Sequence, residues 1–431
     1  MKNYNKDKNV YDAAIERVDF VFNNFNKIYM SFSGGKDSGV MLNLVLDYMR
    51  KNKIQNKIGL MILDNEANYE YSLQFMHKII KENIDLLDVY WCCLPITLPC
   101  TVSSYEIDWQ CWGVGDEHKW IRPMPQEDYI VNLENHKFDF FEENMSYDEF
   151  WDKFGDWYSE GENCANFIGI RTDESLNRYR AIMNENKTMI NNLYWTKKNT
   201  KHTYNVYPIY DWRTEDVWIA NAKYDWLYNE LYDIFWRAGL TIAQMRVASP
   251  FMSESKSSLN LYRVIDGHVW SRLCARVSGA NFIATYGKQL SYRTFTLPNG
   301  HTWKSFCKFL LDTLPEESSV NFKQRFIQSL KYWWRVGRGL SEELILDLKT
   351  NNIEFKLGEN TRHGNKDKKC VRMLPPDHLD MLKCHNSEVT SWKRFVITIL
   401  KNDHTCKYLG LAPTHSQAKR QREIQNKYKN I

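Results

Sequence analysis

The stretch IYMSFSGGKDSGVMLNLVLDYMR, residues 28–50, decides the fold of this chain. The apolar run 28–32 predicts a buried strand, residues 33–35 predict a glycine turn, and apolar positions at helical spacing over 40–49 predict an amphipathic helix. Two adjacent glycines let successive backbone N–H groups converge on one point. The first turn of the following helix adds unpaired N–H donors and the positive end of the helix dipole. The stretch therefore predicts an anion-binding loop, and the expected ligand is a phosphate group.

Four side chains of this loop are suited to binding a phosphate. Lys36 places a mobile positive charge beside the expected phosphate, and Ser33 and Ser38 offer hydroxyl groups. Asp37 is expected either to hold a magnesium ion or to fix the loop. The spacing excludes a Walker loop, which needs four residues between its first glycine and Gly-Lys-Ser/Thr, and it excludes the dinucleotide fingerprint Gly-x-Gly-x-x-Gly.

The hexapeptide SGGKDS, residues 33–38, resembles the PP-loop (SGGxDS) of the adenine nucleotide alpha hydrolase superfamily, which includes ATP pyrophosphatases and phosphoadenosine phosphosulfate (PAPS) reductases. The resemblance implies an α/β fold with a doubly wound, mostly parallel sheet of the HUP type. It also implies a site for ATP or PAPS with Mg²⁺, formed in part by Ser33, Gly34, Gly35, Lys36, Asp37 and Ser38. The alternative is a tight strand-to-helix turn that happens to contain two glycines.

A second polar segment follows the continuous apolar run 58–63, which predicts a strand buried on both faces. Asp64 and Glu66 then lie at the carboxyl end of that strand, and ligands of open α/β sheets bind at this edge. PAPS reductases carry an acidic segment at the equivalent place, so both residues are candidates for nucleotide binding. The alternative is a polar loop that caps the predicted helix 69–82.

The stretch GIRTDESLNR, residues 169–178, resembles the GxRxxES segment of the PAPS reductases. Gly169 is expected to let the backbone approach a ligand, and the guanidinium of Arg171 suits a phosphate or sulfate. The resemblance adds Glu174 to the nucleotide site. The alternative is a surface ion pair between Arg171 and Asp173 or Glu174.

Further along, residues 208–218 resemble the P-x-x-x-W-x-x-x-D-V-W segment of the same superfamily. Arg246 lies in an apolar setting and is a candidate second anion contact, the alternative being an arginine with a protein partner. The adjacent Cys92 and Cys93 point to opposite faces of a predicted strand, which favours core packing over a shared metal site. No zinc or iron–sulfur cluster is expected, because zinc-finger spacing and a CxxC motif are both missing.

Composition sets the domain organisation. At 431 residues with 43% hydrophobic content, the chain is long enough for two or three domains. We expect a nucleotide-binding α/β domain at 1–250, interrupted at about 99–165 by an aromatic-rich insertion over the ligand-binding edge, and a mainly helical, basic region at 251–431. His118, Trp120 and Arg122 of the insertion could meet a substrate or belong to a satellite core.

The charge is distributed unevenly. Residues 301–431 carry 24 Lys and Arg against 14 Asp and Glu, whereas residues 1–300 carry 33 against 39. A basic final third suggests a polyanionic partner such as nucleic acid, the alternative being a solvated surface. The sequence has no run of about eighteen apolar residues and no signal-peptide core, and its ten cysteines form no disulfide-like framework, so we expect a cytoplasmic protein without a membrane segment.

The long insertion, the sequence Asp-Glu-Ser after Arg171 and the basic extension together resemble an IbrA-like subfamily related to PAPS reductases. Its members are typically encoded beside a ParB/sulfiredoxin-like partner, which the resemblance implies here as well. Genuine PAPS reductases end in Glu-Cys-Gly-Ile-His, whose thiolate attacks sulfur. This chain has only Cys406 in the sequence HTCKYLG near its end.

Three functions remain open from the sequence. The favoured one is cleavage of ATP between its α and β phosphates, with Lys36, Asp37 and Arg171 as catalytic residues. The reaction would adenylate a nucleic acid or a protein, and sulfur transfer is left open as its purpose. The second is a PAPS-type sulfonucleotide reductase with an atypical nucleophile. The third is a nucleotide-sensing regulator or phage-defence component that binds nucleic acid through residues 301–431.

Overall fold

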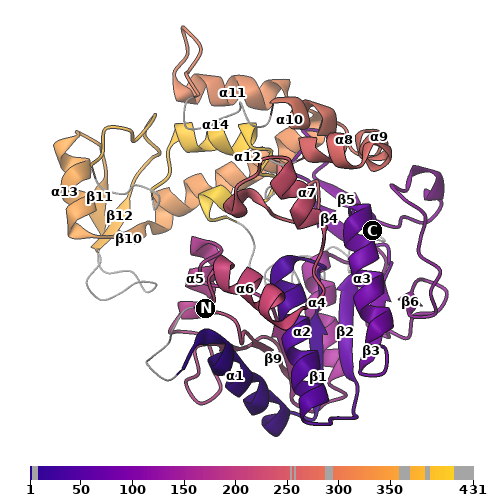
Figure 1. The fold of residues 1–431 in the computed structure, drawn as a ribbon. Coiled ribbons are helices and arrows are strands. Elements are labelled where there is room, and N and C mark those ends of the chain that lie inside the picture. Colours follow the sequence, from indigo (N-terminus) through magenta and orange to yellow (C-terminus); the bar gives the residue numbers. More distant parts are fainter. Residues whose placement is uncertain are drawn as a thin grey trace. The chain divides into compact units, whose positions relative to one another are not determined.

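The computed structural model describes residues 1, 8–252, 255–256, 259–286, 295–358, 369–383 and 389–411 (Figure 1). The sequence also predicts an exposed basic loop at 362–369 and a basic tail from 416; residues 362–368 and the tail lie outside the described residues. The chain forms two compact units: the first holds 1–98, 110–250 and 257–276, and the second holds 99–109, 251–256 and 277–431. The domain bounds predicted from the sequence, 1–250 and 251–431, stay a prediction.

The first unit is organised around a seven-stranded sheet in the order β6-β3-β2-β1-β7-β9-β8. All neighbours run parallel except β8, which is antiparallel to β9. The strands are β1 (Lys27–Ser31), β2 (Ile58–Leu63), β3 (Leu87–Cys92), β6 (Ile130–Val131), β7 (Cys164–Ile168), β8 (Thr196–Lys198) and β9 (Thr203–Val206). The predicted α/β class with a mostly parallel sheet is confirmed.

Helices pack on both faces of this sheet. Tyr29 of β1 contacts the rings of Phe154 and Tyr158 in α4 (Tyr147–Tyr158). Phe32, just after β1, contacts Phe75 of α3 (Glu70–Glu82). Because side chains alternate between faces along a strand, α3 and α4 cover opposite faces. The sheet is therefore doubly wound, as predicted.

The strand order reverses at β1, which lies between β2 and β7. The connection after β1 leads to β2 on one side, whereas β7 pairs on the other side with Ser31 opposite Ile168. In open α/β sheets, ligands bind at the carboxyl ends of the strands where the order reverses. This point is occupied by residues 33–38, which follow β1, and by residues 169–171, which follow β7.

The remaining elements of the first unit are α1 (Val10–Asn24), α2 (Lys36–Lys51), η1 (Glu117–Lys119), α5 (Leu176–Met183), α6 (Thr214–Tyr224), α7 (Leu231–Arg237), η2 (Ile242–Gln244), α8 (Asn260–Ile265) and α9 (Gly267–Arg276). β4 (Thr97–Pro99) and β5 (Asp108–Gln110), whose residues are divided between the ranges of the two units, form a separate two-stranded sheet. The fully buried Trp212, predicted from the motif at 208–218, donates its indole N–H to the carbonyl of Val10 at 3.0 Å. This bond ties α1 to the segment before α6.

The second unit is mainly helical, as predicted. Its helices are α10 (Ala280–Tyr286), α11 (Trp303–Thr313), α12 (Glu316–Lys331), the π-helical turn η4 (Tyr332–Val336), α13 (Glu342–Thr350), α14 (Trp392–Leu400) and η5 (Lys407–Leu409). A small antiparallel sheet, ordered β10-β12-β11, was not predicted; its strands are β10 (Arg338–Leu340), β12 (Lys369–Arg372) and β11 (Lys356–Gly358). Within the described residues, none of the helices combines the length and apolar character that crossing a membrane requires.

Candidate nucleotide-binding site

The loop at 33–38 folds as a tight turn between β1 and α2. Gly34 has φ +69°, and a Cβ there would lie 2.9 Å from the Sδ of Met76. A side chain at this position would therefore be strained by its backbone and crowded by α3. Gly35 precedes α2 as its N-cap residue, and having no side chain it leaves the first-turn N–H groups to other partners.

Most of these N–H groups remain available. Among the described residues, one partner is the hydroxyl of Tyr232, which accepts from the N–H of Lys36 at 3.0 Å. No described residue accepts a hydrogen bond from the N–H groups of Gly34, Gly35, Asp37 and Ser38. The hydroxyls of Ser33 and Ser38 lie 3.1 Å apart beside them. Converging donors of this kind, at a helix N-terminus, form a site suited to an anion.

The charged side chains of the site form a chain of ion pairs. The Oδ1 of Asp37 accepts from the Nε of Arg171 at 2.8 Å, and its Oδ2 lies 3.3 Å from the ammonium of Lys36. Arg171 is only 1% exposed and also donates to the carbonyl of Trp212 at 3.4 Å. The guanidinium therefore fixes Asp37, and Asp37 in turn holds Lys36. These three residues, predicted from the sequence as catalytic, lie together in the structure, and Arg171 reaches the loop through Asp37. Their catalytic role stays a prediction.

Gly169 allows β7 to approach α2. A Cβ at this position would lie 2.6 Å from the carbonyl oxygen of Asp37 and 2.9 Å from the Cα of Ser38. The close approach is to backbone of this chain, which gives the glycine a structural reason. Its predicted contact with a ligand stays a prediction.

Two residues near α7 support the loop and were not predicted as part of the site. The side-chain amide of Asn229 donates to the carbonyl of Gly34 and to the hydroxyl of Ser72, both at 2.9 Å. Tyr232, besides accepting from Lys36, places its ring 5.6 Å from the ammonium of the same lysine. They lie about 195 positions along the chain from the loop, so no local pattern could have indicated the contact.

The candidate residues after β2, Asp64 and Glu66, are instead enclosed by hydrogen bonds and ion pairs to other residues of the protein, which we call the closed network. Asp64 is 0% exposed; its carboxylate accepts from the indole N–H of Trp91 at 2.6 Å and from the N–H of Glu66 at 2.9 Å, and it forms an ion pair with Arg122. The indole of Trp112 donates to the Asp64 carbonyl at 2.8 Å. Arg122, which the sequence offered as a substrate contact, is thus a partner of Asp64.

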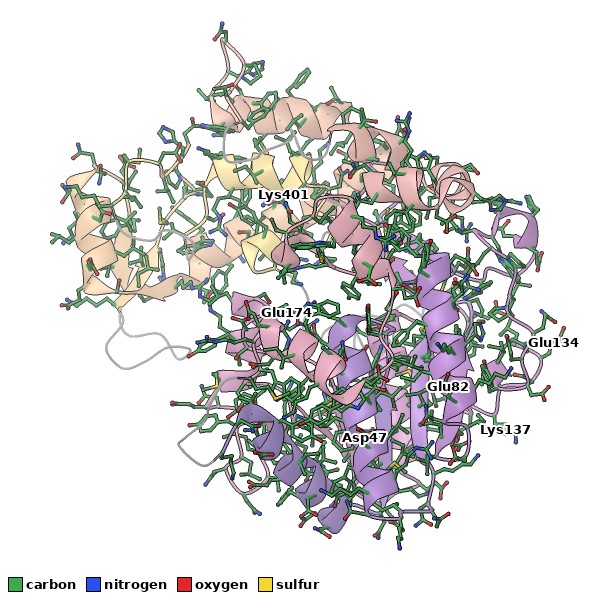
Figure 2. The ribbon with its side chains drawn as sticks, in the orientation of Figure 1. Asp47, Glu82, Glu134, Lys137, Glu174 and Lys401 are labelled. Atoms are coloured by element: carbon green, nitrogen blue, oxygen red, sulfur yellow. The ribbon has the colours of Figure 1, made fainter. Side chains whose placement is uncertain are left out.

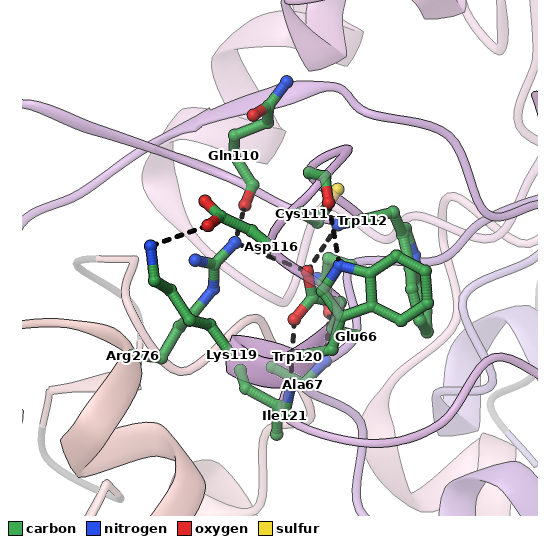
Figure 3. Close-up of polar contacts among 12 residues, drawn as sticks. Glu66, Ala67, Gln110, Cys111, Trp112, Asp116, Lys119, Trp120, Ile121 and Arg276 are labelled. Atoms are coloured by element: carbon green, nitrogen blue, oxygen red, sulfur yellow. Dashed lines mark hydrogen bonds and ion pairs between the residues drawn. The ribbon is translucent and has the colours of Figure 1, made fainter.

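Glu66 is enclosed in the same way (Figure 3). It is 0% exposed, adopts φ +62°, and accepts hydrogen bonds from the backbone N–H groups of Trp112 and Ile121. Arg276 of α9 lies 3.6 Å from its carboxylate. Burial raises the pKa of Glu66, an effect that Arg276 and the two N–H groups partly offset. The predicted nucleotide contacts of Asp64 and Glu66 stay a prediction, while their observed partners belong to the protein.

Glu174 and Arg246 lie together beyond Arg171. The guanidinium of Arg246 donates to the backbone carbonyl of Glu174 at 3.1 Å, and the Glu174 carboxylate lies 3.6 Å from Arg178. Glu174 is labelled in Figure 2. Arg246 is exposed, so its cation is accessible from solvent. The alternative of an arginine with a protein partner therefore applies in part, and the predicted anion contact is not tested.

The described cysteines are buried except Cys274, which is half-buried. Cys92 and Cys93 are buried, which confirms the prediction of core packing, and burial raises the pKa of both thiols. Cys406 is 0% exposed, and burial raises the pKa of its thiol to about 12. A buried thiol that stays protonated at neutral pH is a poor nucleophile.

The arrangement around Asp37 does not suit the Mg²⁺ ligand that the sequence suggested, because both carboxylate oxygens already face cations. Within the described ranges there is also no group of three or more His, Cys, Asp or Glu side chains that could hold a metal ion. The role that the geometry supports for Asp37 is the second one predicted, fixing the loop.

Comparison with known families defines the class of this domain. Residues 117–238 match the model of the phosphoadenosine phosphosulfate reductase domain. Residues 239–420 match a domain of unknown function, DUF3440. This segment of the first unit is therefore PAPS reductase-like, and the match includes Arg171 and Tyr232 but begins after the loop 33–38.

A relative that matches nearly the whole chain shows its family. It is 30% identical over 416 residues to the uncharacterized protein YbdN of Escherichia coli (strain K12), covering 95% of this chain and 92% of YbdN. The chain belongs to the same family as YbdN. The finer assignment to an IbrA-like subfamily stays a prediction.

Solved structures give weaker likenesses. The FMN adenylyltransferase of Candida glabrata, in complex with FMN and an ATP analogue, shares 15% identity over 52% of this chain and 59% of its own, with a TM-score of 0.32. The PAPS reductase of Candida auris shares 14% over 52% and 84%, with a TM-score of 0.27. The U34-tRNA thiolase NcsA of Methanococcus maripaludis, with its [4Fe-4S] cluster, shares 15% over 64% and 79%, with a TM-score of 0.30. Scores this low carry no argument about the chain.

Proposed function

We propose that the first unit binds ATP with its phosphates on the loop 33–38 and cleaves it between the α and β phosphates. An acceptor on a nucleic acid or a protein attacks the α-phosphorus, the bond to the bridging oxygen breaks, and the products are an adenylated substrate and pyrophosphate. The observation that carries this proposal is the set of open N–H groups at the strand-order reversal, beside the ion-paired Lys36, Asp37 and Arg171.

The contacts of each group indicate its role in the proposed reaction. The open N–H groups and the ammonium of Lys36 stabilise the negative charge that builds on the departing pyrophosphate. Asp37 holds that ammonium in place, and Arg171 acts through Asp37 as a positioning residue. We do not assign the Asp37 carboxylate as a Mg²⁺ ligand, because both of its oxygens already face cations of the protein.

The alternative chemistries fare differently. Burial of Cys406 counts against a sulfonucleotide reductase that uses this thiol. PAPS in place of ATP would use the same phosphate loop, and a role as a nucleotide-sensing regulator or phage-defence factor would need binding without turnover. A cytoplasmic location, a ParB/sulfiredoxin-like partner, sulfur transfer and nucleic-acid contact through residues 301–431 remain parts of the proposal suggested by the sequence.

The test is the product formed from ATP by the full chain, with and without RNA or DNA as acceptor. We expect AMP-containing products and pyrophosphate, and we expect Lys36→Ala to reduce pyrophosphate release at least about 100-fold, as loss of a charge-stabilising group does. Lys51→Ala, at the exposed far end of the same helix, is the matched control and should leave release unchanged.

Asp37→Ala should also abolish release, but it leaves the buried Arg171 without its carboxylate, so circular dichroism must show that the variant is folded. Formation of ADP and phosphate, or equal pyrophosphate release by the parent chain and Lys36→Ala, would overturn the proposal.

A further inference from the structure

The small sheet of the second unit packs one face on a core, and part of its other face is exposed to solvent. Val371 of β12 is 0% exposed and packs in a core that includes Trp333 and Leu340. Because side chains alternate along a strand, its neighbour Arg372 projects from the opposite face. Lys356 of β11 lies directly opposite Arg372 in the antiparallel register. This open face therefore carries two cations in one cross-strand pair.

Two glycines form the floor under Arg372. Gly337 has φ +76°, and a Cβ there would lie 2.8 Å from the Cγ of Arg372. A Cβ at Gly358 would lie 3.9 Å from the Nε of the same arginine. The stem of Arg372 thus lies across flat backbone, which presents its guanidinium in a restricted position.

An exposed tryptophan adjoins the two cations. Trp334, in the π-helical turn η4, is 53% exposed, and the ammonium of Lys356 lies 5.7 Å from its ring centroid. Like charges placed directly opposite on a sheet are destabilising. Neither Lys356 nor Arg372 has an ion-pair partner among the residues that the structure describes. The face combines an exposed aromatic ring with two cations for which the described part of the chain supplies no carboxylate partner.

We propose that this face, formed by Trp334, Lys356 and Arg372, binds single-stranded nucleic acid. An unpaired base stacks on the indole of Trp334, and backbone phosphates neutralise Lys356 and Arg372. A duplex hides the faces of its bases within the stack, so a flat surface with an exposed ring suits single strands better. The proposal does not rest on the reaction at the loop 33–38, which is assayed separately.

The experiment is fluorescence anisotropy of a labelled single-stranded RNA of about 20 nucleotides, titrated with the full chain at several salt concentrations. We expect Trp334→Ala to weaken binding about tenfold, since a base stacked on an aromatic ring contributes about that much. We expect Arg372→Gln to lower the slope of log affinity against log salt by about 0.7, the value for one phosphate contact on a single strand.

Matched controls lie in the same unit. Phe309→Ala removes a ring that is 51% exposed in α11, and Lys323→Gln removes a cation that pairs with Asp312. Both should bind like the parent chain. Equal binding by Trp334→Ala and the parent chain, no RNA binding at low salt, or equal competition by duplex DNA or by poly-glutamate would each overturn the proposal. Pyrophosphate release from ATP, measured on the same variants, reports on the other site independently.

Discussion

The ends of β1 and β2 lie side by side at one edge of the sheet, yet they differ in what they leave open. After β1, backbone N–H groups remain available next to Lys36. After β2, Asp64 and Glu66 are each 0% exposed, and protein donors engage their carboxylates. The donors come largely from the insertion, through Trp112, Ile121 and Arg122. Position at the ligand-binding edge therefore does not by itself make a residue available to a ligand, because an inserted segment can cover one strand end and leave the neighbouring one open.

The largest effect should come from breaking the closed network. Arg122→Leu leaves the Asp64 carboxylate buried without its cation, so the free energy of unfolding should fall by about 3–5 kcal/mol. Urea unfolding followed by circular dichroism measures this change. Lys119→Leu removes a cation from the exposed pair with Asp116 and should have little effect. Equal stability of the two variants would show that the network is not a structural anchor.

A smaller effect should follow from crowding the open end. Gly169→Ala places a Cβ 2.6 Å from the carbonyl of Asp37, so either β7 or the start of α2 must move. Overpacking of this kind costs about 1–3 kcal/mol, and the displaced loop should bind ATP more weakly. Calorimetric titration of ATP measures the affinity. Gly267→Ala, whose Cβ would meet no atom within 4 Å, is the control. Unchanged ATP affinity in Gly169→Ala would show that the close approach at this glycine does not position the loop 33–38 for ATP binding.

The smallest effect concerns the pH dependence of Glu66. Because burial raises its pKa above the ordinary 4.5, the folded chain binds this proton more tightly than the unfolded chain does. The stability contributed by Glu66 is therefore fully present below its unfolded pKa and is lost as pH rises through the folded pKa, by at most about 1.4 kcal/mol per pH unit.

Urea unfolding of the parent chain and Glu66→Gln at a series of pH values above 4.5 isolates this contribution. The stability of the parent chain relative to the variant should decline as pH rises. A difference that stays constant or grows with pH would mean that the carboxylate is charged in the fold at no cost.

Sequence patterns predicted the elements whose structure depends on residues close together in the chain. The apolar runs that became β1 and β2, the glycine turn and α2 are each encoded within a few residues, and they fix the fold class. The partners of Asp64 and Glu66 could not be predicted, since Arg122 and Arg276 come from distant segments. The small sheet was missed because its strands have three or four residues, too few to show alternation.

One boundary had a signal that was available. The sequence predicts a helix over 321–336. In the structure this helix starts earlier, at Glu316, as α12, and changes to a π-helical turn at Tyr332. Pro315 followed by two glutamates is a recognisable helix start. The change to a π-helical turn at Tyr332 has no comparable signature in the sequence.

The central claim is that nucleotide phosphates bind the open N–H groups of the loop 33–38. Hydrogen exchange followed by mass spectrometry, with and without saturating ATP, reads these amides directly. The claim predicts slower exchange in peptides that contain Gly34, Gly35, Asp37 and Ser38, and no such slowing in Lys36→Ala. Unchanged exchange at these amides in the parent chain, with protection appearing at residues 64–66 instead, would contradict it.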